Sequence, residues 1–183
     1  MLLRTDLKSE RRELPLALPW DHPVSVVEAI TWLDVDHSPR YRPDDTHTWC
    51  NIFAWDVANC IGSILPHWVD PENAPISPFH GRELTANGMA QWLWSDGERF
   101  GWGEVHRGDV QRKVNDGAFA IAIWKAPLGH HGHVAVCRPG PTRPDDPWIA
   151  QAGRKCFSCG VLSEGFNDLV PQFWMNEKTV NVE

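Results

Sequence analysis

The chain has 183 residues, of which 42% are hydrophobic and 22% charged, so it is long enough for one domain with a sizeable core. Its net charge is −7 and it has no long lysine or arginine run, which argues against a nucleic-acid partner, because phosphate contacts need clustered positive charge. No apolar run approaches the roughly 18 residues of a membrane span, so we expect no membrane partner.

The N-terminal segment lacks the features of a targeting signal. Residues 1–20 are polar and then contain prolines, which predicts an arm packed on a single domain formed by residues 21–183. Residues 1–8 have no apolar stretch of the kind found in a signal peptide, so we expect synthesis in the cytoplasm. The first helix is predicted over Pro23–Leu33, since its apolar residues share one side and proline suits a helix start.

The next predicted helix begins at a cysteine. Thr48 can cap this helix with its hydroxyl, and apolar residues from Phe53 to Ile64 recur at helical spacing. A thiol in the first helical turn lies near backbone N–H groups and the positive end of the helix dipole, which favours the reactive thiolate. Cys50 is therefore a candidate nucleophile.

The middle of the chain predicts irregular structure and then two further helices. Four prolines rule out a long helix in residues 65–82. Thr85 is placed to cap a helix from Ala86 to about Ser95. A short helix over residues 109–116 would be capped by Asp109 and end at Gly117.

The C-terminal part changes to short apolar runs with turn residues between them, a pattern typical of strands. Because these runs follow the helices instead of alternating with them, the sequence predicts an α+β fold with a mostly antiparallel sheet. The predicted strands are Ala118–Trp124, His133–Cys137, Trp148–Ala152 and Val170–Met175.

Two of these strands carry side chains that a cysteine nucleophile needs. His133 opens a strand after a glycine-containing loop, so its ring can leave the end of the sheet and act as a base. Gln151 is the one polar residue in an apolar strand, where its amide can accept from the imidazole N–H and fix the tautomer. A cysteine, a histidine and a polar residue on separate elements follow the logic of a catalytic triad.

Four segments together resemble the NlpC/P60 and CHAP group of papain-like peptidoglycan hydrolases. They are Thr-Trp-Cys50-Asn, Gly-His133-Val-Ala-Val, Ile-Ala-Gln151-Ala-Gly, and the helical segment Leu84–Ala90. The resemblance implies a papain-like fold, with N-terminal helices packed on an antiparallel sheet. It also implies catalysis by Cys50, His133 and Gln151, without a cofactor. The implied activity is that of an amidase or endopeptidase that cleaves stem peptides of the bacterial cell wall.

The resemblance also implies candidates for oxyanion stabilisation and a biological context. A tyrosine upstream of the cysteine assists the oxyanion in such enzymes, and Tyr41 is the only tyrosine of this chain. Asn51 and His47 are the alternative side-chain donors. The expected partner is bacterial peptidoglycan, reached in the periplasm or cell wall through a phage, a holin or a secretion apparatus. A secreted antibacterial effector would also have an immunity protein as a partner.

Other interpretations remain open at this point. The same fold could act on a protein amide as a deamidase or acyltransferase, or could serve as a binding domain without catalysis. The pair Cys156 and Cys159 has the CxxC spacing of zinc ligands, and Cys137, His130 or His131 are candidates for the two further ligands. Because there is no second CxxC, a metal site is the weaker alternative. Five cysteines in a chain made in the cytoplasm do not suggest a disulfide framework.

Overall fold

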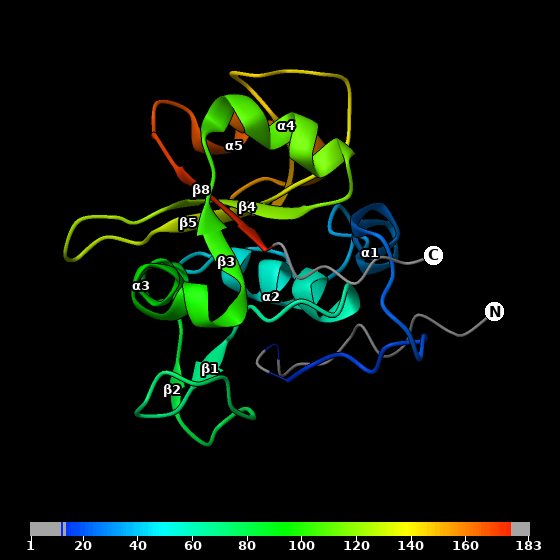
Figure 1. The fold of residues 1–183 in the computed structure, drawn as a ribbon. Helices are drawn as coiled ribbons and strands as arrows, with labels where there is room; N and C mark the ends of the chain where they lie inside the picture. The colour runs from blue at the N-terminus through cyan, green and yellow to red at the C-terminus, as the bar shows by residue number, and fades with distance from the viewer. Residues whose placement is uncertain (1–11, 13, 177–183) are drawn as a thin grey trace.

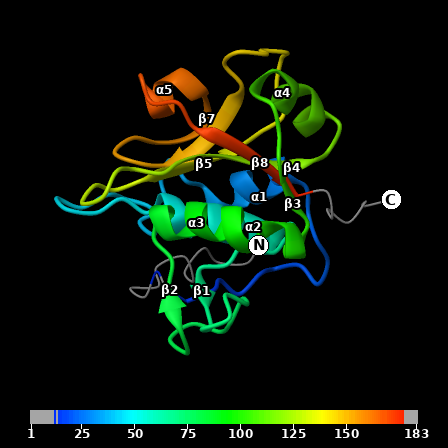
Figure 2. The same cartoon turned by 60° about the vertical axis from the view of Figure 1, so that its left-hand side comes forward.

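The computed structural model describes residue 12 and residues 14–176, and Figures 1 and 2 show that these form three layers. A sheet lies in the middle, with α1, α2 and α3 on one face and α4 and α5 on the other. The helices are α1 (Val26–Leu33), α2 (Cys50–Cys60), α3 (Ala86–Asp96), α4 (Arg107–Asn115) and α5 (Leu162–Phe166), and a 3₁₀ helix covers Gly97–Phe100.

The central sheet has six antiparallel strands in the order β3-β8-β4-β5-β6-β7. A separate two-stranded sheet, β1 with β2, lies beyond the helical layer (Figure 1). Helices on an antiparallel sheet confirm the α+β prediction. The strands are β1 (Trp68–Val69), β2 (Arg82–Glu83), β3 (Trp102–Glu104), β4 (Phe119–Trp124), β5 (His133–Cys137), β6 (Trp148–Ala152), β7 (Cys156–Val161) and β8 (Gln172–Asn176).

Each face of the sheet packs into its own apolar cluster. In β4, Phe119, Ile121 and Ile123 face the cluster that includes α1, α2 and α3. The alternate residues Ala120 and Ala122 face the cluster that includes α4 and α5. This alternation follows from the two-residue period of a strand. The sheet is therefore buried on both sides.

Two helix starts differ from those predicted. The first helix begins at Val26, not at Pro23, because Ser25 and Glu28 form a capping box: the Ser25 hydroxyl accepts from Glu28 N–H, and the Glu28 carboxylate accepts from Ser25 N–H. Helix α4 begins at Arg107, because the cap is His106 and not Asp109. The His106 ring accepts from the N–H of Gly108 over 3.2 Å.

The predicted strands are confirmed, with small changes at their ends, but several short elements were missed. Strands β5 and β6 have the predicted bounds, and β4 and β8 begin one and two residues later than predicted. Strand β7 and helix α5 had been left unassigned, since the run Cys-Phe-Ser-Cys-Gly carries no apolar alternation. Strands β1, β2 and β3 have two or three residues each, too few to give a pattern.

A buried ion pair fixes α2 in the core. Arg40 and Asp56 are 1% and 2% exposed, and the Arg40 guanidinium donates two hydrogen bonds to the Asp56 carboxylate over 2.7 and 3.0 Å. The Tyr41 hydroxyl donates to the same carboxylate over 2.7 Å. Arg40 also donates to the carbonyl of Leu14, which ties the N-terminal segment to the domain.

The predicted N-terminal arm falls partly outside the described residues, which exclude residues 1–11 and 13. Of the remainder, Leu16, Leu18 and Trp20 pack, partly buried, against the core beneath the sheet. Among the helices that the structure describes, none combines the length and apolar character needed to cross a membrane.

Candidate active site

Cys50 is the first residue of α2 and is 3% exposed. The residue before the helix is Trp49, which makes no capping hydrogen bond with its side chain, so the predicted cap by Thr48 is wrong. The first N–H groups of a helix have no partner within it. Without a side-chain cap, these donors stay available to a negative charge at the Cys50 sulfur or at a substrate oxygen.

His133 and Gln151 lie beside Cys50 as a hydrogen-bonded pair. His133 Nε2 is 2.7 Å from Gln151 Oε1, and Gln151 Nε2 donates to the carbonyl of Lys155 over 3.1 Å. Because an amide oxygen only accepts, Nε2 of His133 must carry the hydrogen. The other ring nitrogen, Nδ1, is thereby left for the hydrogen bond between His133 and the Cys50 thiol.

The two groups shift each other's protonation. Burial raises the pKa of the Cys50 thiol, but the hydrogen bond and charge of His133, with backbone hydrogen bonds from Val134 and Asn51, outweigh burial and leave that pKa below its ordinary value. Burial lowers the pKa of His133, but Cys50 and Gln151 outweigh it and leave that pKa raised. Both directions favour a thiolate beside an imidazolium.

The other described thiols differ from Cys50 in this respect. Burial raises the pKa of Cys60 to about 12 and also raises the pKa of Cys137 and, together with the Asp36 charge, of Cys156. Cys60 and Cys137 are core residues with 1% exposure each. Of these four cysteines, only Cys50 has an environment that favours the nucleophilic form.

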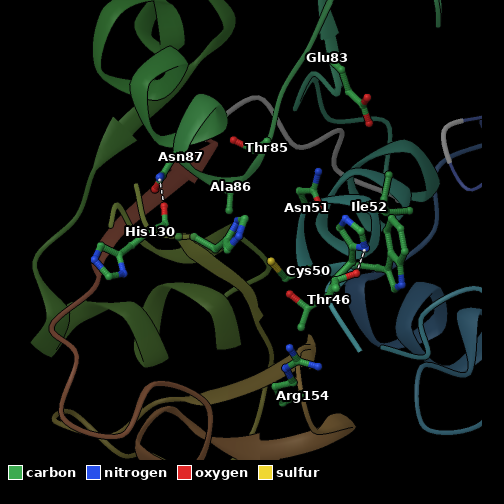
Figure 3. A pocket seen from close by; sticks show the side chains of 15 residues that line it. Thr46, Cys50, Asn51, Ile52, Glu83, Thr85, Ala86, Asn87, His130 and Arg154 are labelled. Atoms are coloured by element: carbon green, nitrogen blue, oxygen red, sulfur yellow. Dashed lines mark hydrogen bonds between the residues drawn. The ribbon is translucent and has the colours of Figure 1, made fainter. Parts of the chain in front are cut away.

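Two adjoining cavities open at the site. The larger, of about 740 Å³, includes Cys50 in its wall, and the smaller, of about 320 Å³, includes His133 and Gln151. Figure 3 shows the Cys50 sulfur in the middle of the larger cavity, with Ala86 and Asn87 on one side and Thr46 and Arg154 on the other. Both volumes lie in the range of small-molecule sites. Residues shared by the two cavities are Thr48, His131, Gly132 and Arg154.

Arg154 joins the segment before α2 to the turn between β6 and β7. Its guanidinium donates to the carbonyls of Asp44 and Asp45 over 2.7 and 3.2 Å. The Asp44 carboxylate in turn accepts from the N–H groups of Thr46 and His47, and these bonds hold its pKa well below the usual range. These contacts fix the rim that both cavities share.

Asn87 joins the start of α3 to the loop that leads to His133. Its side-chain nitrogen donates to the carbonyl of His130 over 2.9 Å, as Figure 3 shows, and its oxygen accepts from the N–H of Ala126 over 2.8 Å. Helix α3 is capped by Thr85, as predicted, through a 3.2 Å bond from Gly88 N–H. Asn87 therefore holds the β4–β5 connection near both of its ends, and we call this connection the histidine loop.

The three predicted oxyanion donors lie in different places. Tyr41 is fully buried, lines neither cavity, and donates its hydroxyl to Asp56, so its predicted oxyanion role is wrong. The Asn51 side chain lines the larger cavity but donates to the carbonyl of Leu84 over 2.9 Å. His47 also lines this cavity, and its ring stacks on Trp49.

The CxxC pair does not form a metal site. Cys156 and Cys159 lie in strand β7, which had been left unassigned. Cys156 donates its thiol to the carbonyl of Tyr41, and Cys159 is exposed. Across residue 12 and residues 14–176, no group of three or more His, Cys, Asp or Glu side chains is arranged to hold a metal ion.

Sequence reasoning did not identify Arg154, Asn87 or Trp49 as parts of the site. In the sequence, Arg154 is half of an isolated basic pair with Lys155, and Asn87 is part of the predicted helical segment Leu84–Ala90. Their roles come from bonds that span 110 and 43 residues, so no local pattern marks them. For Trp49, the position next to the nucleophile was a usable signal.

Comparisons with known proteins do not assign this chain to a family. No protein-family model matches it, and no curated protein matches it either.

Proposed function

We propose that this protein is a cysteine hydrolase that cleaves amide bonds. The observation that carries the proposal is the Cys50–His133–Gln151 arrangement at the start of a buried helix. The pKa of Cys50 is lowered and that of His133 is raised, and both shifts favour a thiolate–imidazolium pair. We further propose a papain-like fold and stem peptides of bacterial peptidoglycan as the substrate, as an amidase or endopeptidase. This part rests on the resemblance of the sequence around the three residues to the NlpC/P60 and CHAP group.

In the proposed mechanism, the Cys50 thiolate attacks the substrate carbonyl and forms a tetrahedral oxyanion. The free N–H of Cys50 at the helix start donates to this oxygen, with His47 as the candidate second donor. His133 passes its Nδ1 proton to the leaving amine, which leaves a thioester on Cys50. His133 then takes a proton from water, hydroxide attacks the thioester, and the carboxylate product leaves with Cys50 regenerated. Gln151 keeps the ring in the tautomer that both steps need.

The test is digestion of purified peptidoglycan, followed by mass spectrometry of the soluble products. We expect defined stem-peptide fragments from the wild type and none from Cys50→Ala. Cys159→Ser is the matched control, because Cys159 is an exposed thiol outside both cavities, and its fragments should equal those of the wild type. Fragments from Cys50→Ala would contradict the proposed nucleophile.

A measurement of thiol reactivity distinguishes an error in the proposed substrate from an error in the proposed chemistry. If the wild type releases no fragments while Cys50 is alkylated faster than the other cysteines, the peptidoglycan part of the proposal fails and an amide on a protein becomes the substrate to test. If Cys50 is also slow, the cysteine-hydrolase proposal fails. Delivery by a phage, a holin or a secretion apparatus, with an immunity protein as partner, remains part of the proposal for the peptidoglycan case.

A further inference from the structure

Cys50 and His133 line different cavities, so the two cavities can hold the two halves of a substrate. We propose that the smaller cavity, beside His133, holds the leaving amine, and that Arg154 and Lys155 make it selective for leaving groups that carry a carboxylate. This inference rests on the proposed function, because it takes Cys50 as the nucleophile and His133 as the acid.

The direction follows from the position of the acid. In amide hydrolysis the group that leaves is the amine, and it must take its proton from His133. The acid must lie within hydrogen-bond reach of the departing nitrogen. His133 and Gln151 line the smaller cavity, and Cys50 with its neighbouring backbone lines the larger one. The acyl part of the substrate therefore occupies the larger cavity, and the part that follows the scissile nitrogen occupies the smaller.

The charges of the smaller cavity favour an anion. Arg154 and Lys155 both line it, and both side chains are exposed. Arg154 donates to two backbone carbonyls, which are neutral groups and do not offset its positive charge. Glu164 is the one acidic residue in the lining, and its carboxylate accepts from Val161 N–H at the start of α5. Besides His133, the cavity thus has two cations against one carboxylate that caps a helix.

This charge pattern defines a class of substrate. A leaving residue with a free carboxylate near the scissile nitrogen would place that carboxylate between the Arg154 and Lys155 side chains. Guanidinium and ammonium groups are both suited to carboxylates, and Arg154 keeps donors beyond the two that bind backbone. An amide whose amine part is uncharged would lose this interaction. Bonds to residues with a free carboxylate are therefore the preferred class.

The first test uses two alkylating agents of nearly equal size, neutral iodoacetamide and anionic iodoacetate, on the intact protein. We expect the rate ratio of iodoacetate to iodoacetamide at Cys50 to exceed the ratio for a free thiol peptide. Lys155→Gln should lower the ratio about two- to fivefold, as the loss of one partly exposed charge does, and Lys155→Glu should lower it further. Lys155 is chosen because Arg154 also holds the Asp44–Asp45 segment.

The matched control is Lys113→Gln in α4, which removes the same charge from a residue outside both cavities. It should leave the ratio at the wild-type value. A ratio equal to that of the free peptide, or a ratio that Lys155→Glu does not change, would overturn the inference.

The second test compares two stem-peptide fragments that differ only in the leaving residue, which is a free acid in one and a carboxamide in the other. The wild type should cleave the acid with the higher kcat/KM, and Lys155→Gln should reduce this preference. Equal kcat/KM values in the wild type would overturn the inference while leaving the hydrolase proposal in place. If neither fragment is cleaved but the iodoacetate preference holds, the proposed substrate fails and the anion-selective cavity stands.

Discussion

At the scale of single residues, Cys50 and His133 depend on each other for their charge. Burial alone would keep the thiol protonated and the imidazole neutral, and the contact between them is the main interaction that reverses both preferences, with help from backbone hydrogen bonds to Cys50 and from Gln151 on His133. Because the groups are coupled, their titration belongs to the pair. Both shifts widen the pH range in which the thiolate–imidazolium form is populated.

The first prediction concerns the pH dependence of Cys50 alkylation by iodoacetamide. Wild-type Cys50 should react well below the ordinary thiol pKa of about 8.5, because its pKa is lowered. In His133→Ala the opposing effect of burial remains, so the midpoint should rise and the rate at pH 6.5 should fall at least about tenfold. His131→Ala is the control, since His131 lines both cavities but is absent from the contacts that lower the pKa. An unchanged midpoint in His133→Ala would refute the ion pair.

The second prediction concerns Gln151. In Gln151→Ala the His133 ring loses the acceptor that fixes its tautomer, and a hydrogen bond to a group that becomes charged is worth about 1.5–3 kcal/mol. We expect kcat to fall about 10- to 100-fold with little change in KM, because the contact acts on the acid and not on bound substrate. Gln111→Ala is the control, because Gln111 is a buried glutamine of α4 that lines neither cavity. Equal losses in both variants would point to a structural effect instead.

At the scale of elements, short contacts hold α2 and the histidine loop in place. Helix α2 carries Cys50, the proposed nucleophile, at its first residue and the buried Asp56 carboxylate about two turns later. The Arg40–Tyr41 segment, which precedes the helix, binds that carboxylate. The position of Cys50 therefore depends on a buried charge pair on the same helix.

The third prediction is that Asp56→Asn lowers the free energy of unfolding by about 3–5 kcal/mol, because it leaves the Arg40 charge buried without its partner. Tyr41→Phe should cost less, since it removes one hydrogen bond and leaves the charge pair. Urea denaturation of both variants measures the two losses. Asp109→Asn, in an exposed pair with Arg112, is the control and should change stability little. A loss below about 1 kcal/mol for Asp56→Asn would contradict the role given to this pair.

The fourth prediction concerns Gly132, the residue before His133, the proposed catalytic histidine. A side chain here would collide with Asn87 Oδ1 and would place its Cβ 2.7 Å from the Trp124 carbonyl oxygen, so the loop must move in Gly132→Ala. A displacement of about 1 Å at a catalytic group can cost about 10²-fold in rate, and we expect a loss of this order in kcat. The alkylation midpoint of Cys50 should also rise, which a defect in substrate binding alone would not cause. Gly103→Ala in β3 is the control, because nothing lies within 4 Å of its added carbon.

The elements also show how much of the site local sequence patterns can predict. Cys50, His133 and Gln151 each carry a local signal, namely a helix start, a strand start after glycine, and a polar residue in an apolar strand. Their positions were therefore predicted, and the structure brings them together. The capping box of Ser25 and Glu28 was also readable as Ser-x-x-Glu, yet the proline before it was given more weight.

Other parts of the site could not be read from local patterns. Arg154 and Asn87 act through bonds to distant backbone, and strand β7 gains its place by pairing with β6 and not from its own alternation. Tyr41 was chosen by resemblance alone, and the buried Asp56 that engages its hydroxyl looked like any polar residue of an amphipathic helix.

At the scale of the whole molecule, the site exists only where the layers meet. Cys50 comes from the helical layer that packs with Val134 and Ala150. His133 lies against Phe166 of α5 on the other face, with ring centroids 4.9 Å apart. The proposed nucleophile and the proposed acid thus approach each other around the end of β5, and both apolar clusters must be intact for them to meet. Conditions that loosen the packing of the layers should therefore reduce activity before the protein unfolds completely.

A buried histidine in the helical layer, His67, is expected to make this packing sensitive to acid. It is 1% exposed, and its ring lies 5.0 Å from that of Trp55 on α2. Burial, helped by the charge of Arg40, lowers its pKa from the ordinary 6.5 to about 4, although Glu83 Oε1 lies 3.0 Å from Nε2. Glu83 is half exposed, so solvent weakens its pull on the proton, and His67 is neutral in the folded protein at pH 7.

The fifth prediction follows from the difference in the pKa of His67 between the folded protein and the unfolded chain. The unfolded chain takes up a proton at His67 below about pH 6.5, whereas the folded protein does so only near pH 4. The contribution to stability is therefore complete above pH 6.5 and is lost as the pH falls from 6.5 towards 4. At about 1.36 kcal/mol for each pH unit, the loss is about 3 kcal/mol, most of it by pH 4.5.

Urea denaturation at pH 7.5 and pH 4.5 measures this contribution as the difference between two unfolding free energies. His67→Gln should show a smaller difference than the wild type by about 2–3 kcal/mol, whatever the substitution does to stability at pH 7.5. His80→Gln is the control, since His80 is exposed, and it should keep the wild-type difference. Equal differences in His67→Gln and the wild type would mean that the folded protein protonates His67 as readily as the unfolded chain. The acid sensitivity of the layer that carries Cys50 would then have to come from other groups.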